Sequence, residues 1–138
     1  MFLPVILIVA NSIAGANFSG KKACTSEEAN AAENETDHLR DWASVHRSYV
    51  HFSHCDDGSI AEGYSDAVGK LLAEHWDQFS RLAQLVSNDK EFGRFVIKHI
   101  DHTLPNDVLL KISKSARSRC PVGREKYCAE IAHAASNN

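Results

Sequence analysis

The sequence lacks the motifs that identify the common enzyme and metal-binding folds. It has no G-x-S-x-G turn of an α/β-hydrolase, no C-x-x-C pair of a zinc site and no calcium loop with EF-hand spacing. It also has no internal repeat, no low-complexity segment and no clear linker. Its apolar start is shorter than the ~20 residues that a membrane-spanning helix needs. The periodicity of the apolar residues, the cysteines and the charge pattern therefore carry most of the information.

The first 16 residues predict export. Residues 2–16 are almost wholly apolar and end in Ala14-Gly15-Ala16, a small-x-small pattern typical of a secretory cleavage site. No Lys or Arg precedes this stretch, which is unusual for a signal peptide and leaves an uncleaved membrane anchor as the alternative. Residues 17–138 suffice for a single domain with its own core. We therefore expect one helical domain, secreted or periplasmic.

Apolar residues recur at helical spacing through almost all of residues 17–138, and no segment shows the alternation of a half-buried strand. The pattern predicts about five helices. They cover residues 26–52, residues 59–86 with a break near 76–79, residues 90–100, a segment with Pro105 in its first turn, and a short segment from residue 123 to 135. Capping boxes are expected at Thr25 with Glu28 and at Ser59 with Glu62. The sequence thus predicts an all-α fold, a bundle or small helical array cross-linked by disulfides.

Four cysteines in an exported chain predict two structural disulfides rather than a metal site. They are Cys24, Cys55, Cys120 and Cys128. If residues 26–52 form one helix, its ends lie ~40 Å apart, whereas the Cα atoms of a disulfide lie within about 7 Å. This geometry excludes Cys24–Cys55 and predicts that each of these two residues pairs with a C-terminal cysteine. If residues 26–37 are not helical, the local pairs Cys24–Cys55 and Cys120–Cys128 return.

The densest polar cluster runs from His51 to Gly58, with His46 one turn earlier. Its imidazole and carboxylate groups could ligate a divalent metal, but the simpler interpretation is a helix end and a turn in which Asp56 or Asp57 caps the next helix. Further along, the carboxylates of Glu62 and Asp66 lie four residues apart and share a helix face. Gly63 and Gly69, inside the same predicted helix, indicate close packing or a bend. The residues expected at a binding surface are His54, Asp56, Asp57, Glu62 and Asp66. Catalytic residues, a bound metal and a cofactor are not expected.

The charge is uneven along the chain although the net charge is only −3. Residues 24–57 contain eight acidic and two basic residues, whereas residues 90–128 contain nine basic and four acidic residues. The favoured interpretation is that the two halves face each other or are simply solvated, ahead of a field that attracts a partner. The basic residues Lys111, Lys114, Arg117, Arg119 and Arg124 suit a phosphate, a lipid headgroup or an acidic protein. The low net charge disfavours nucleic acid.

Two functional hypotheses follow from these features. In size and organisation the chain is similar to small exported helical proteins of bacteria, among them immunity proteins that neutralise toxins in the periplasm. That resemblance implies a protein-binding module, an inhibitor or immunity factor, without a membrane span after cleavage. The alternative is a small metal-dependent or acid/base hydrolase centred on His46, His51, His54, Asp56, Asp57 and Glu62. A structural or chaperone-like protein is a third interpretation.

Overall fold

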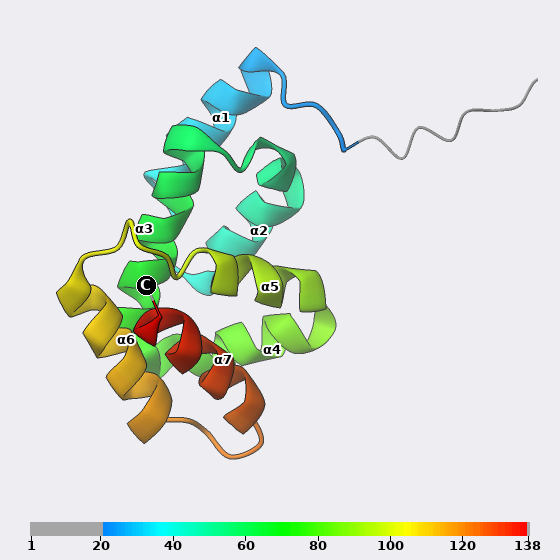
Figure 1. The fold of residues 1–138 in the computed structure, drawn as a ribbon. Helices are drawn as coiled ribbons and strands as arrows, with labels where there is room; N and C mark the ends of the chain where they lie inside the picture. Colours follow the sequence, from blue (N-terminus) through cyan, green and yellow to red (C-terminus); the bar gives the residue numbers. More distant parts are fainter. Residues whose placement is uncertain (1–20, 138) are drawn as a thin grey trace, which may run out of the picture.

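The computed structural model describes residues 21–137, and the predicted signal peptide, residues 1–16, lies outside them. Within this range the chain forms seven α-helices, two short 3-10 helices and no strand (Figure 1). The elements are α1 (Ser26–Thr36), α2 (Trp42–Phe52), η1 (Ser53–Cys55), α3 (Gly58–Glu74), η2 (Trp76–Gln78), α4 (Phe79–Asn88), α5 (Lys90–Lys98), α6 (Asn106–Ser118) and α7 (Glu125–Ser136). The predicted all-α fold is confirmed.

The long helix α3 connects two groups of helices (Figure 1). At one end of the molecule, α1 and α2 pack on each other and on α3; towards the other end, α6 packs on both α3 and α7. The α4–α5 pair completes the fold, because α4 contacts α2 and α5 contacts α7. The buried apolar residues of both groups form one continuous core. Its largest fully buried side chains are Trp42, Tyr64, Phe79 and Phe92, each at most 2 % exposed.

The prediction of one helix over residues 26–52 is wrong, because the chain breaks between Thr36 and Trp42. Asp41 has an extended backbone, and its carboxylate accepts a 2.7 Å hydrogen bond from the backbone N–H of Ser44, which caps α2. Leu39 lies in the break and is still buried, at 5 % exposure. The apolar pattern thus continues through the turn between α1 and α2, so periodicity alone does not reveal the break.

This turn also explains why the predicted disulfide pattern is wrong. The bonds are Cys24–Cys55 and Cys120–Cys128, and no free cysteine remains among residues 21–137. Because α2 turns back along α1, the Cα atoms of Cys24 and Cys55 lie 5.0 Å apart, well within the reach of a disulfide. The argument against this pair required a continuous helix. The prediction that the cysteines form disulfides is confirmed.

The second predicted helix does break near residues 76–79, as expected, and the break is held by Trp76. The indole N–H of Trp76 donates to the backbone carbonyl of Arg119 at 2.9 Å, and its ring stacks on Phe79 with centroids 4.5 Å apart. Trp76 therefore joins the elbow between α3 and α4 to the C-terminal end of α6.

The predicted helix caps are confirmed in part. The capping box of Thr25 with Glu28 is present at the start of α1. The box predicted for Ser59 is wrong, because α3 begins one residue earlier and its N-cap is Asp57, whose carboxylate accepts from the N–H of Gly58 at 2.9 Å. Gly58 has φ of +54°, a left-handed conformation that favours glycine. Pro105 directly precedes α6 rather than lying in its first turn.

The two interior glycines of α3 mark close contacts within the chain. A Cβ at Gly63 would lie 2.5 Å from the hydroxyl oxygen of Thr36, and a Cβ at Gly69 would lie 2.6 Å from a methyl carbon of Leu104. The Thr36 hydroxyl donates to the carbonyl of Glu33 at 2.8 Å, which fixes the side chain at the C-terminal end of α1. Gly63 is thus the point at which α1 approaches α3.

Replacement of Gly63 by alanine is expected to destabilise the protein by about 1–3 kcal/mol, because the short, hydrogen-bonded Thr36 side chain leaves no room for a methyl group. Helix propensity alone would give the opposite sign, a gain of about 1 kcal/mol. Urea denaturation measures the difference. The double variant Gly63→Ala/Thr36→Gly, which also removes the Cβ of Thr36, should recover part of the loss; a stabilised single variant would contradict the close contact.

Candidate functional site

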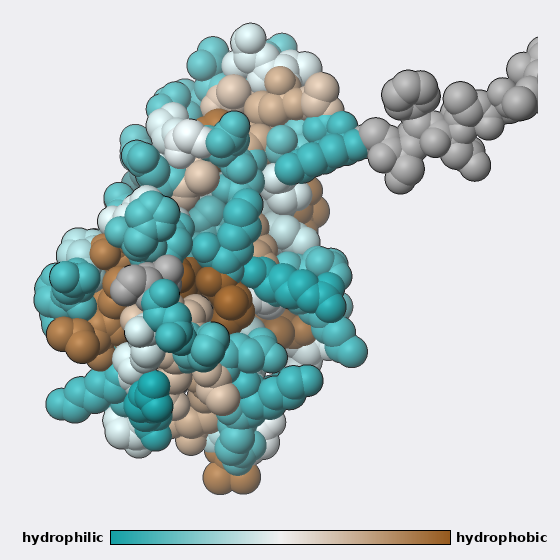
Figure 2. All heavy atoms as spheres, in the orientation of Figure 1, coloured by the Kyte–Doolittle hydropathy of each residue, from teal (hydrophilic) through white to brown (hydrophobic). Residues whose placement is uncertain are grey.

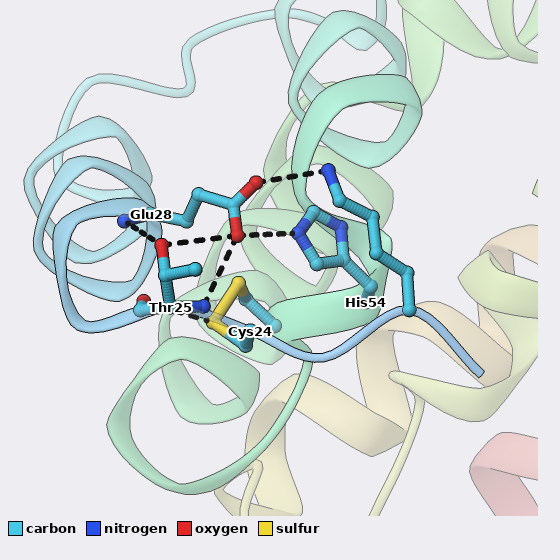
Figure 3. Close-up of a disulfide and its surroundings, with 6 residues drawn as sticks. Cys24, Thr25, Glu28 and His54 are labelled. Atoms are coloured by element: carbon cyan, nitrogen blue, oxygen red, sulfur yellow. Dashed lines mark hydrogen bonds and ion pairs between the residues drawn. A yellow bond between two sulfur atoms is a disulfide. The ribbon is translucent and has the colours of Figure 1, made fainter. Parts of the chain in front are cut away.

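The segment from His54 to Asp57 lies at the junction of η1 and α3, beside the Cys24–Cys55 disulfide (Figure 3). An open cavity of about 670 Å³ occurs there. Its polar lining comes from Lys21, His54, Asp56, Asp57 and Ser59, and the disulfide forms part of the wall. Of the residues predicted at a binding surface, the structure therefore brings His54, Asp56 and Asp57 together.

Glu28 of α1 bridges this junction. One carboxylate oxygen accepts a hydrogen bond from the Lys22 ammonium group at 2.9 Å, and the other lies 3.2 Å from Nε2 of His54 (Figure 3). The Lys22 ammonium group, the backbone N–H of Thr25 and His54 together lower the pKa of Glu28 to about 2. Glu28 is therefore an anion at neutral pH and attaches the segment that precedes α1 to η1.

The junction does not provide the ligand set of a metal centre. Within residues 21–137, the group of at least three potential ligands whose donor atoms lie close together is Glu28, His54 and Cys55. The Cys55 sulfur is bonded to Cys24, and a disulfide sulfur is not a thiolate ligand. Two ligands remain, and Lys22 already occupies one carboxylate oxygen. These residues do not fit a structural zinc or calcium ion.

Asp56 belongs to a buried polar network that connects η1, α3 and the segment after α5. Its side chain is 5 % exposed, and Oδ2 accepts from Nε2 of His99 at 3.0 Å and from Nζ of Lys98 at 2.8 Å. The network continues from Nδ1 of His99 to the Ser65 hydroxyl at 2.9 Å, and from that hydroxyl to Oδ2 of Asp101 at 2.8 Å. Asp56 therefore lines the cavity at η1 but directs Oδ2 to partners within the protein.

The hydrogen-bond partners assign the protons in this network. The Ser65 hydroxyl has one hydrogen and donates it to the Asp101 carboxylate, so Nδ1 of His99 must donate to Ser65. Nε2 lies 3.0 Å from Oδ2 of Asp56, a carboxylate oxygen that only accepts. His99 thus lies between two carboxylates, one in direct contact and one reached through Ser65.

Burial alone would raise the pKa values of both carboxyl groups, but their partners lower them. The pKa of Asp56 lies below its usual value because hydrogen bonds from His99 and Lys98 outweigh the cost of burial. The pKa of Asp101 is lowered in spite of burial by hydrogen bonds from Thr103 and Ser65. The network is thus arranged to keep both carboxylates charged.

Ser65, His99 and Asp56 follow one another as the members of a Ser-His-Asp triad do, but the geometry does not suit nucleophilic catalysis. Ser65 is only 1 % exposed, so a substrate carbonyl does not reach its hydroxyl group. Its proton is already donated to Asp101 rather than to the imidazole, which would have to act as the base. The arrangement stabilises the fold by connecting three segments.

The other predicted site residues lie apart from the cavity at η1. Nε2 of His46 bonds to Asp89, the N-cap of α5, at 2.9 Å, and the imidazole packs against Phe92. His51 is exposed on the last turn of α2. Glu62 and Asp66 are both exposed on α3, next to the contact between Gly63 and Thr36. The histidines and carboxylates proposed for a hydrolase are thus divided among separate positions.

The sequence analysis did not predict the network around His99. The partners of His99 are 34 and 43 residues away, at Ser65 and Asp56, so no local spacing connects them. The available signal was a histidine on the apolar stripe of α5 that required polar partners elsewhere. Glu28 was recognised as part of a capping box, but its contacts with Lys22 and His54 were not.

Comparisons with models of protein families, with curated proteins and with solved structures found no match. None of the helices in residues 21–137 is both long enough and apolar enough to cross a membrane. The two disulfides are compatible with an exported protein.

Proposed function

We propose that the chain is an exported protein-binding module that recognises a cationic partner through an acidic surface on α1 and the first half of α3. The observation that carries the proposal is an excess of exposed carboxylates without ion pairs at the α1 end of the molecule, where the cations Arg40 and Lys70 lie beside Asp37 and Asp66 but are outnumbered. The small, disulfide-linked helical domain also suits an inhibitor or immunity protein in the periplasm or outside the cell.

The acidic surface consists of exposed carboxylates that form no ion pair with described residues. Residues 24–66 contain ten acidic and two basic residues. The members that are exposed and form no ion pair are Glu27, Glu33, Asp37, Asp41, Asp57, Glu62 and Asp66. The contact of Thr36 with Gly63 places the end of α1 against α3, so Asp37, Glu62 and Asp66 border the same junction. Asp56 is not part of this surface because it is buried.

Unpaired cations gather at the other end of the molecule. Lys111, Lys114 and Arg119 lie on or directly after α6 and form no ion pair with the residues that the structure describes. Figure 1 places α1 at one end of the molecule, and α6, α7 and their connecting loop at the opposite end. The charged halves therefore do not neutralise each other. Such a field orients an approaching charged partner and increases its association rate.

The test is affinity capture from the envelope and medium of the exporting cell, with the oxidised mature chain as bait. A triple variant, Asp37→Asn/Glu62→Gln/Asp66→Asn, removes three charges from the acidic surface. The matched control, Glu74→Gln/Asp77→Asn/Asp107→Asn, removes three exposed charges elsewhere. We expect a stoichiometric partner that the wild type and the control retain and that the surface variant binds at least about tenfold more weakly.

Two results would overturn the proposal. Retention of the partner by both variants would show that binding does not use the acidic surface. Failure of correctly folded, oxidised bait to retain any stoichiometric protein would remove the protein-binding function itself. Circular dichroism and a free-thiol assay of each bait establish that it is folded and oxidised.

A further inference from the structure

A groove on the opposite half of the molecule has features that the acidic surface does not explain. It lies between the C-terminal end of α4, the helix α5 and the start of α7, and its volume is about 430 Å³. Four cations line it: Lys90, Arg94, Arg124 and Lys126. One carboxylate, Glu130, lies among them. Figure 2 shows hydrophilic side chains over α5 and its surroundings, in agreement with a polar rim.

The walls of this basic groove are fixed by hydrogen bonds within the chain. The Tyr127 hydroxyl donates to the backbone carbonyl of Gly93 at 3.1 Å, which joins α7 to α5. The Arg124 guanidinium donates to the Ser87 hydroxyl at 2.7 Å, which joins the start of α7 to the end of α4. Burial and the charge of Glu130 raise the pKa of Tyr127, so its hydroxyl remains a donor that is already in use. The groove is therefore preformed.

Two of the four cations are free to bind a ligand. Lys90 and Lys126 are exposed and form no ion pair or side-chain hydrogen bond with residues 21–137. Arg94 pairs with Glu91 on the outer surface of α5. The lining thus carries an excess of positive charge. The ammonium groups of Lys90 and Lys126 have no partner among residues 21–137 and can turn towards a ligand. Ammonium groups bind phosphate oxygens through short charge-assisted hydrogen bonds.

Two helices also begin at this groove, α5 at Lys90 and α7 at Glu125. The N-terminus of α7 has no side-chain cap at its N-cap residue, Arg124. The Glu125 carboxylate accepts from the N–H of Gly123 at 3.0 Å, but Glu125 lines a different groove, between α6 and α7. The N-terminus of α5 is capped by the Asp89 carboxylate, so the positive end of the α7 dipole is the one that adds to the field of the four cations.

We propose that the basic groove binds a phosphate-type anion. The ligand class is an anionic phosphate group, a free phosphate or a phosphodiester, held between Lys90 and Lys126 and supported by Arg94, Arg124 and the start of α7. A soluble phosphate compound and the headgroup of an anionic phospholipid both present this chemistry. The site is separate from the acidic surface, and its function does not depend on the proposed protein partner.

Two probes distinguish the sources of the ligand. Inorganic pyrophosphate is titrated into ¹⁵N-labelled oxidised protein, and the backbone amide signals of residues 90–94 and 123–127 are followed. Sedimentation with vesicles of phosphatidylglycerol, compared with vesicles of phosphatidylcholine, tests the headgroup. We expect saturable shifts confined to these residues for a soluble ligand, and binding to phosphatidylglycerol vesicles alone for a lipid headgroup.

The double variant Lys90→Ala/Lys126→Ala should weaken binding by at least about tenfold, because it removes both unpaired cations. The matched control, Lys111→Ala/Lys114→Ala on α6, removes the same charge elsewhere and should change binding by less than about twofold. Neither pair has a partner whose loss would unfold the protein. Equal weakening by both variants would show general charge attraction and overturn the site, as would the absence of binding to both probes.

Discussion

Replacement of Asp56 by alanine is expected to lower the free energy of unfolding by about 3 kcal/mol at neutral pH. The variant removes the carboxylate that accepts from His99, whose side chain is 2 % exposed, and leaves the buried Nε2 of His99 without a hydrogen-bond partner. The exposed ammonium group of Lys98 can turn to water, so its lost ion pair contributes little. Urea denaturation of the oxidised protein, followed by circular dichroism, measures the change.

The adjacent Asp57 provides the matched control. Asp57 is exposed and caps α3 through the N–H of Gly58, so Asp57→Ala should cost about 1 kcal/mol. The two aspartates are neighbours in the sequence and carry the same charge, but only Asp56 belongs to the buried network. Equal losses in the two variants would contradict the role of the network.

The pH dependence follows from the lowered pKa of Asp56. A carboxyl group whose pKa is lower in the folded state than its ordinary value of 3.8 contributes stability that is present above that value and is lost as the pH falls through the folded pKa. The wild type should therefore lose stability below about pH 4. Asp56→Ala should lose less over the same range, so the two curves converge in acid. The lowered pKa of Asp101 gives both proteins a remaining slope.

Removal of the Cys24–Cys55 disulfide, in the variant Cys24→Ala/Cys55→Ala, is expected to cost about 3.5 kcal/mol. The two cysteines are 31 residues apart, and the loop-closure entropy of the unfolded chain sets this magnitude. The same change at Cys120 and Cys128, which are 8 residues apart, should cost about 2.5 kcal/mol. Chemical denaturation of both variants tests the order, and a larger loss at the C-terminal disulfide would contradict it.

Amide hydrogen exchange shows which helices lose protection when the Cys24–Cys55 disulfide is removed. Only Ala32 and Thr36 are buried in α1, so this helix has little core contact of its own. The disulfide holds the segment before α1 against η1, and Glu28 reinforces the connection through His54. Without the disulfide, the amide protons of α1 should exchange much faster than those of α3 and α6. Uniform loss of protection over all helices would show that α1 does not open separately.

The fold class followed from periodicity because each long helix buries one apolar face, and 3.6-residue spacing is independent of the chain's path. The break at residues 37–41 could not be predicted from periodicity, because the buried Leu39 continues the apolar pattern of α1 and α2 at the point where the chain reverses direction. The cap that ends the stripe, Asp41 with Ser44, was visible in the sequence but competed with a pattern that spans it. The disulfide pattern depended on that one turn and was wrong with it.

The candidate site was less predictable than the fold. His54, Asp56 and Asp57 do lie together, since they are near neighbours in the sequence. Whether each is buried depends on residues far away: Asp56 is buried because the C-terminal end of α5 brings Lys98 and His99 to it. A polar cluster in one segment therefore identified the junction, but not which of its carboxylates faces solvent.

The protein has one tryptophan in each of its two groups of helices, and both are buried. Trp42 begins α2 in the group with α1, whereas Trp76 lies at the elbow beside Phe79 and the end of α6. Variants that keep only one indole would give each group its own fluorescence signal. Coincident emission changes during denaturation would then indicate a single cooperative unit, and separate midpoints would reveal a half-folded state.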